Sequence, residues 1–155
     1  MRKNLFLFVM AMLMVMPSAL KAQDLVQTGE ISIYSYKAPT YNDRNHSLTQ
    51  QIYKAGEIGR SGTIYSIAFK SDFSEAVRNL DIYMVHTNKN NFNNSTDWVP
   101  VTAANRVFSG NVNFIGNYQW STIELSVPFN YNGTDNLLLV VDDNTGSAGG
   151  TKYFG

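Results

Sequence analysis

The chain has 155 residues and no cysteine, and its 12 basic residues balance its 12 acidic ones to give a formal net charge of zero. The absence of cysteine excludes disulfide bonds, thiolate catalysis and cysteine-ligated metal centres, and the balanced charge argues against a nucleic-acid partner. Only His46 and His86 remain for imidazole chemistry, so the composition does not favour an enzyme.

Residues 1–22 have the order of basic, apolar and small residues that is typical of a secretory signal peptide. An uncharged run from Leu5 to Met16 follows two basic residues, and Ala22 offers a cleavage point before Gln23. A helix of this run is about 18 Å long, less than the roughly 30 Å of a bilayer core, so export is favoured over a single membrane anchor. Cleavage removes 22 of the 155 residues and three basic side chains, leaving a mildly acidic chain of 133 residues. We therefore expect a protein secreted from, or displayed on, a Gram-negative bacterium, with no membrane span after signal removal.

The remaining chain alternates apolar and polar residues in the manner of β-strands and has no long stretch of helical spacing. We expect seven strands, at residues 31–36, 47–53, 63–69, 80–87, 106–114, 120–127 and 136–142. Ser109-Gly110 predicts a bend or bulge in the fifth strand, and Pro128 is expected to end the sixth. The unbroken apolar run from Leu137 to Val141 predicts a strand that is covered on both faces or lies in the middle of a sheet.

Short strands separated by frequent glycine and asparagine turns indicate an all-β fold, an antiparallel β-sandwich. A jelly roll and an immunoglobulin-like strand order fit the spacing equally well. In the third strand, strict alternation places Thr63, Tyr65, Ile67 and Phe69 on one face.

Five segments in this order carry a resemblance to a known family: Gln50–Gly59, Gly62–Phe69, Leu80–Thr87, Thr96–Val101 and Pro128–Gly146. The chain resembles the N-terminal surface modules of secreted Bacteroidetes proteins, which are related to the cleaved-adhesin jelly-roll domains of gingipain-type haemagglutinins. The resemblance implies a non-catalytic, jelly-roll-like β-sandwich, often joined to fibronectin-type modules or to a peptidase. Members of the family vary in their ligands, so it implies a type of role and no substrate.

The chain is accordingly divided into a signal peptide at 1–22, an N-terminal lead-in at 23–34 and an adhesin-like sandwich at 35–155. The last residues, 151–155, have the pattern of the beginning of a further strand, whereas more chain follows in the resembling modules. We therefore expect the sandwich to be truncated at its C-terminus, with an open sheet edge and part of its core exposed.

The signal peptide and the resemblance predict a secreted, non-catalytic recognition or adhesion module that binds a glycan or a surface protein of a host or a bacterium. The alternative is an N-terminal accessory or spacer domain of a longer secreted peptidase or multi-module surface protein. Neither interpretation includes a catalytic activity, because the sequence has no nucleophile elbow, zinc-binding histidine pair or phosphate-binding loop.

Four residues are candidates for ligand binding. Asn93, Asn94 and Trp98 belong to an asparagine-rich stretch between the fourth and fifth strands, and Tyr118 stands between two amide residues. Sugar binding needs a flat exposed ring beside polar groups, which these residues could supply. An ordered loop built from asparagine turns, with Trp98 packed, is the structural alternative.

Asp142, Asp143 and Asn144 are the candidate metal ligands, because carboxylate and amide oxygens suit Ca²⁺. Their spacing is not that of an EF-hand loop, and a strand end followed by an Asx turn explains the same residues. The resemblance favours a structural calcium ion, because related adhesin modules carry one.

Overall fold

The structure, a computed structural model, describes residues 24–28, 37–71, 76–150 and 154. In chain order, these residues form β1 (Ser47–Tyr53), α1 (Ala55–Ile58), β2 (Gly62–Ser71), β3 (Ala76–Thr87), a 3-10 turn η1 (Ala103–Asn105), β4 (Arg106–Phe114), β5 (Gln119–Tyr131) and β6 (Asn136–Asp143). The expected signal peptide and the expected strand at 31–36 lie outside the described residues.

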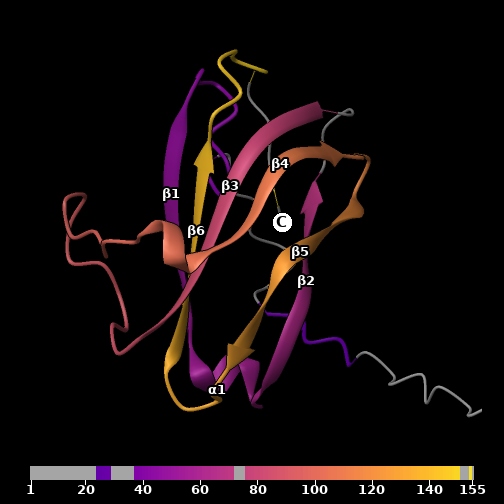
Figure 1. The fold of residues 1–155 in the computed structure, drawn as a ribbon. Helices are drawn as coiled ribbons and strands as arrows, with labels where there is room; N and C mark the ends of the chain where they lie inside the picture. Colours follow the sequence, from indigo (N-terminus) through magenta and orange to yellow (C-terminus); the bar gives the residue numbers. More distant parts are fainter. Residues whose placement is uncertain (1–23, 29–36, 72–75, 151–153, 155) are drawn as a thin grey trace, which may run out of the picture.

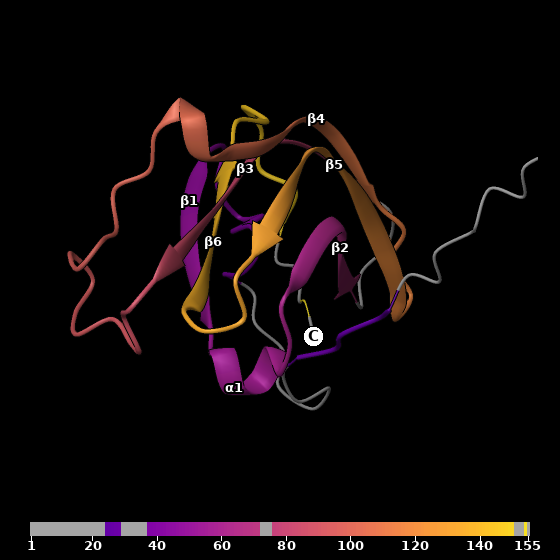
Figure 2. The same cartoon turned by 60° about the horizontal axis from the view of Figure 1, so that its bottom comes forward.

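The strands form an antiparallel β-sandwich of two layers, which confirms the predicted fold class (Figure 1). One sheet has the order β1-β6-β3-β4, so the last strand in sequence is inserted between the first and the third. The other sheet pairs β2 with β5. Figure 2 shows the corner at which the chain leaves β4 for β5, and Asn117 and Tyr118 take positive φ angles of 52° and 59° there.

The hydrophobic core lies between the two sheets. Leu80, Ile82 and Phe114 are fully buried at its centre, and β6 contributes Leu137, Leu139 and Val141 from its inner face. Because burial of one such side chain contributes roughly 1.5–3 kcal/mol, this layer of apolar side chains is the main source of stability without any disulfide.

Strand β6 is buried on its outer face as well. Leu138 and Val140 alternate with the core residues of the strand, and each has an exposed fraction of 0%. In register they lie beside Ile52 and Gln50 of β1 and beside residues of β3. The prediction that this apolar run is covered on both faces is therefore confirmed, and the cover has to come from outside the two sheets.

An irregularity in the pairing of β2 with β5, where β5 has the extra residues, changes the predicted faces of β2. The register shifts between Ile64 and Ser66, because one residue of β2 stands opposite four of β5. Ile64 and Ile67 both pack against the core as a result, whereas Tyr65 points outward with 51% of its surface exposed. The expectation that Tyr65 shares a face with Ile67 is wrong, since a bulge reverses the alternation.

Two expected breaks also differ from the structure. Strand β5 runs through Pro128 to Tyr131, because Pro128 falls in the unpaired stretch at the bulge, where its missing N–H costs no ladder hydrogen bond. The irregularity in the β3–β4 pairing lies between Ile82 and Tyr83, while Gly110 pairs regularly with Leu80.

Candidate functional site

The connection between β3 and β4, residues 88–102 and hereafter the β3–β4 loop, covers the outer face of the four-stranded sheet. The Nε2 of Gln50 donates to the Val99 carbonyl (2.7 Å), and the Val99 N–H donates to Oε1 of Gln50 (3.0 Å). Since Gln50 is the register partner of Val140, this pair of bonds places the Val99 backbone over the outer side of β6. At the other end, Nδ2 of Asn136 donates to the Lys89 carbonyl (2.9 Å).

Asp97 organises the far part of the loop. Its carboxylate accepts hydrogen bonds from the Asn93 backbone N–H (2.9 Å) and from Nδ2 of Asn93 (3.1 Å), and it forms an ion pair with Lys89 (2.5 Å). The backbone hydrogen bond from Asn93 and the contacts with Lys89 together lower the pKa of the Asp97 carboxyl. At neutral pH, Asp97 is therefore a fixed anion and a hydrogen-bond acceptor.

Asparagine turns complete the loop, as the structural alternative for this stretch expected. Oδ1 of Asn94 accepts hydrogen bonds from the Thr96 N–H (2.9 Å) and from the Thr96 hydroxyl (2.7 Å). This Asx-type arrangement satisfies backbone donors locally, so the loop keeps a defined shape without regular secondary structure.

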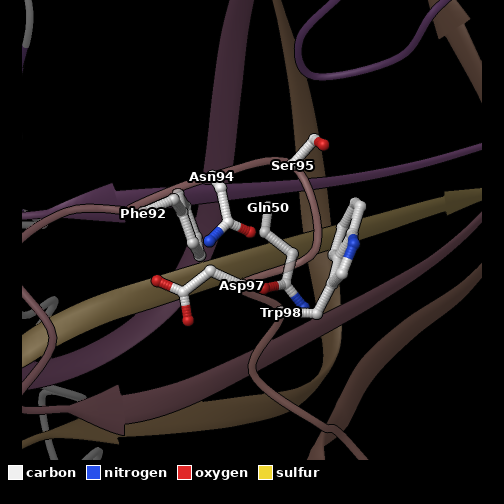
Figure 3. Close-up of a pocket in the computed structure, with 6 residues that line it drawn as sticks. All are labelled: Gln50, Phe92, Asn94, Ser95, Asp97 and Trp98. Carbon is white, nitrogen blue, oxygen red and sulfur yellow. The ribbon is translucent and has the colours of Figure 1, made fainter.

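A hollow of about 200 Å³ lies between this loop and β1. It is lined by Gln50, Phe92, Asn94, Ser95, Asp97 and Trp98. In Figure 3 the rings of Phe92 and Trp98 stand on either side of the Gln50 and Asn94 side chains. Trp98 keeps 48% of its surface exposed, so the ring offers a face to solvent. The hollow is smaller than the roughly 300–1,000 Å³ of drug-sized sites, so a single small ring is the largest group it holds.

Of the predicted ligand-binding residues, Asn94 and Trp98 line this hollow together. Asn93 belongs to the same loop, where it positions Asp97. Tyr118 is separate from them: it lies in the β4–β5 corner, and its backbone N–H donates to the carbonyl of Ser71 at the end of β2 (2.7 Å). Sequence reasoning missed Gln50 because it lies 49 residues before Val99, on a strand whose pairing was not predicted.

Of the candidate calcium ligands, Asp142 and Asn144 interact through a side-chain hydrogen bond, whereas Asp143 lies apart from them. Asp142 and Asp143 are neighbours on a strand and therefore point to opposite faces of the sheet. The Asp143 carboxylate is fully buried and is held by Arg78, whose Nε and Nη2 lie 2.8 Å and 2.6 Å from Oδ2. Its other oxygen accepts hydrogen bonds from the N–H and hydroxyl of Thr145. The guanidinium is thus the cation that this carboxylate binds.

Arg78 also joins β3 to two loops. Its Nη1 donates to the Ser147 carbonyl (2.9 Å), and its Nη2 donates to the Arg44 carbonyl (3.2 Å). A buried guanidinium has to satisfy its donors to offset the loss of water, and these acceptors do so. The bond from Arg78 to Ser147 joins the segment after β6 to β3, and the backbone N–H of Asn144 donates to the carbonyl of Asn79 in β3 (2.8 Å).

Asp142 faces the outer side of the sheet, where Asp81 is its register partner. Partial burial and the nearby charges of Asp81 and Asp143 raise the pKa of the Asp142 carboxyl above its ordinary value. In the described parts of the chain, no three or more His, Cys, Asp or Glu side chains are grouped so that they could hold a metal ion.

The side chain of His86 packs against the β5–β6 turn. Its Nε2 accepts a hydrogen bond from the Asn132 backbone N–H (3.0 Å), and its ring centroid lies 4.9 Å from that of Phe129. The imidazole is thus occupied by neighbouring groups of the fold.

Comparison with known proteins gives no relative: no family model, no curated protein and no solved structure matches this chain. The resemblance to Bacteroidetes surface modules therefore stays a prediction. None of the helices within the described ranges is long and apolar enough to cross a membrane.

Replacing Arg78 with methionine leaves the Asp143 carboxylate buried without its cation. We expect the free energy of unfolding to fall by about 3–5 kcal/mol, as measured by urea denaturation. Arg60→Met is the matched control, because it breaks only the exposed ion pair between Arg60 and Asp24 (2.7 Å) and costs less than about 1 kcal/mol. Equal losses in the two variants would contradict the structural role assigned to Arg78.

The substitution Asp142→Asn tests whether the negative charge of Asp142, on the outer face of the four-stranded sheet, destabilises the fold. Because the pKa of Asp142 is raised in the fold, ionisation disfavours the native state, and the penalty is present at pH 7. We expect the variant to melt at a higher temperature than the parent at pH 7. The difference should shrink as the pH falls through the raised pKa towards and below 3.8, the ordinary pKa of the carboxyl, because the Asp142 carboxyl of the parent then becomes neutral. A melting difference that is independent of pH would show that charge is not the cause.

Proposed function

We propose that the chain is an exported, non-catalytic recognition module that binds a glycan in the hollow of the β3–β4 loop. One observation carries the proposal: the half-exposed ring of Trp98 lines a hollow of about 200 Å³ together with Phe92 and with polar side chains of β1 and the β3–β4 loop. The proposal narrows the sequence-based expectation of a glycan or protein ligand to a glycan.

The chemistry of the hollow suits a sugar. A pyranose has an apolar C–H face that stacks on an aromatic ring, and the half-exposed Trp98 offers such a ring. Sugar hydroxyls are donors and acceptors, and the amide of Asn94, the hydroxyl of Ser95 and the anionic carboxylate of Asp97 can pair with them.

The loop is also ordered in advance of binding. Gln50 holds Val99 by two hydrogen bonds, and Asp97 holds Asn93 and Lys89. A site whose side chains are already fixed loses less conformational entropy when a ligand arrives, which matters most for a small and weakly bound ligand.

The expected signal peptide and the resemblance to secreted Bacteroidetes adhesin modules support the cellular part of the proposal. On these grounds we propose that the module lies outside the cell or on the surface of a Gram-negative bacterium, where glycans are abundant. The β3–β4 loop reaches past β1 on the side away from β2 and β5, so a large glycan can approach it without meeting the second sheet (Figures 1 and 2).

Trp98→Ala is the direct test on a glycan array. We expect the parent to bind a defined set of glycans and the variant to lose at least about tenfold in affinity, because one stacked ring with its buried area contributes about 1.5 kcal/mol. Trp120→Ala is the matched control, since Trp120 is similarly exposed (45%) but lies on the β2–β5 sheet.

The array result is interpreted only for variants whose circular dichroism matches that of the parent. A folded parent that binds no glycan would refute the proposal, and so would a Trp98→Ala variant that binds as well as the Trp120→Ala control.

A further inference from the structure

The turn between β5 and β6 contains the dipeptide Asn132-Gly133, the only Asn-Gly pair in the sequence of 155 residues. Asn132 is exposed to solvent. An asparagine that precedes glycine is chemically labile, because the backbone nitrogen of the next residue can attack the side-chain amide carbon and glycine has no side chain to obstruct the approach. The turn therefore combines a reactive dipeptide with access to water.

The fold requires glycine at position 133. Its φ angle is 78°, in the left-handed region, and an added Cβ would lie 2.8 Å from both the Cβ and the backbone nitrogen of Ser61. Both conditions exclude a larger residue, because a side chain in this conformation is strained and this one would also overlap Ser61. The bulky neighbour that would shield Asn132 from attack therefore has no room here.

The side-chain carbonyl of Asn132 is polarised by two backbone N–H groups. Its Oδ1 accepts hydrogen bonds from the N–H of Thr134 (3.0 Å) and from the N–H of Asp135 (3.1 Å). These bonds fold the side chain back over the backbone of residues 133–135, as in an Asx turn. Two donors on one carbonyl oxygen also stabilise the negative charge that develops on it when a nucleophile adds to the carbon.

The neighbouring groups hold the amide but leave the attacking nitrogen unengaged. The Nδ2 of Asn132 donates to Oδ2 of Asp135 (2.7 Å), and the backbone N–H of Asn132 donates to Nε2 of His86 (3.0 Å). No hydrogen bond ties the N–H of Gly133 to another residue of the described ranges. The side chain is thus fixed close to a backbone nitrogen that is free to react.

We propose that Asn132 is a modification site at which the chain deamidates without an enzyme. The nitrogen of Gly133 bonds to Cγ of Asn132, the Cγ–Nδ2 bond breaks, and the proton of the Gly133 N–H leaves with Nδ2 as ammonia. Water then hydrolyses one of the two C–N bonds of the resulting cyclic imide. The product is aspartate or, where the original main-chain bond breaks, isoaspartate. This chemistry does not depend on glycan binding.

Either product weakens the turn. A carboxylate at position 132 replaces the amide that donates to Asp135, so two negative charges lie where a hydrogen bond was. Isoaspartate also adds a methylene group to the main chain, next to β6, which lies inside the four-stranded sheet. Because the chain cannot reverse the reaction, deamidation limits the lifetime of the folded module.

Incubation of the folded chain in mildly alkaline buffer, followed by peptide mapping with mass spectrometry, tests the proposal. We expect Asn132 to be converted at least about tenfold faster than Asn94, a difference of about 1.4 kcal/mol in activation free energy. Asn94 is the internal control, because it is also exposed and its Oδ1 also accepts a backbone N–H, that of Thr96, but serine follows it. The conversion of Asn132 should proceed in the folded chain within about tenfold of its rate in urea.

Asn132→Ser keeps a side-chain oxygen for the turn and cannot form the imide. We expect the melting temperature of the parent to fall during storage and that of Asn132→Ser to stay constant. Asn132→Asp supplies one product directly and should melt below Asn132→Ser. If either variant does not fold, the peptide map of the parent decides.

Two results would overturn the proposal. One is conversion of Asn132 that is no faster than that of Asn94. The other is an Asn132 that stays intact in the folded chain while it deamidates in urea, because the fold would then protect the residue.

Discussion

The strand that the whole molecule depends on is β6, because its five consecutive apolar residues cannot all face one core. Leu137, Leu139 and Val141 fill the space between the sheets, and Leu138 and Val140 require a second cover on the other side. The β3–β4 loop supplies that cover, and Gln50 and Asn136 fasten it to the strands on which it lies. The same demand for burial thus positions the loop and creates the hollow beside Trp98.

The two sheets differ in strand number, with four strands in one and two in the other among the described residues. The four-stranded sheet is closed by the loop on its outer side and by the core on its inner side. A hollow of about 710 Å³ lies along β2, and residues 24–28 are among those that line it. The ion pair of Arg78 and Asp143 ties β3 and the end of β6 to neighbouring loops.

The fold class could be predicted because the alternation of apolar and polar residues, and the run of apolar residues in β6, are local patterns. Each follows directly from the burial of one or both faces of a strand. The irregularity at Tyr65 could not be predicted, since it depends on the length of β5 opposite it. Trp98 and Asn94 were identified from residue type alone, whereas Gln50 joins them only through strand pairing. The charge pattern at Asp142 and Asp143 suggested a cation, but the guanidinium of Arg78, from a distant strand, holds Asp143 in the fold.

The central claim is that the β3–β4 loop is fastened to the outer face of β6 through Gln50 and Val99. Amide hydrogen exchange of Val99, followed by NMR, tests it most directly, because its N–H donates to the Gln50 side chain. We predict that this amide is protected by about 100-fold or more over an unstructured peptide, and that the protection is lost in Gln50→Ala while the β5 amides keep theirs. A Val99 amide in the parent that exchanges as fast as an unstructured peptide would contradict the account.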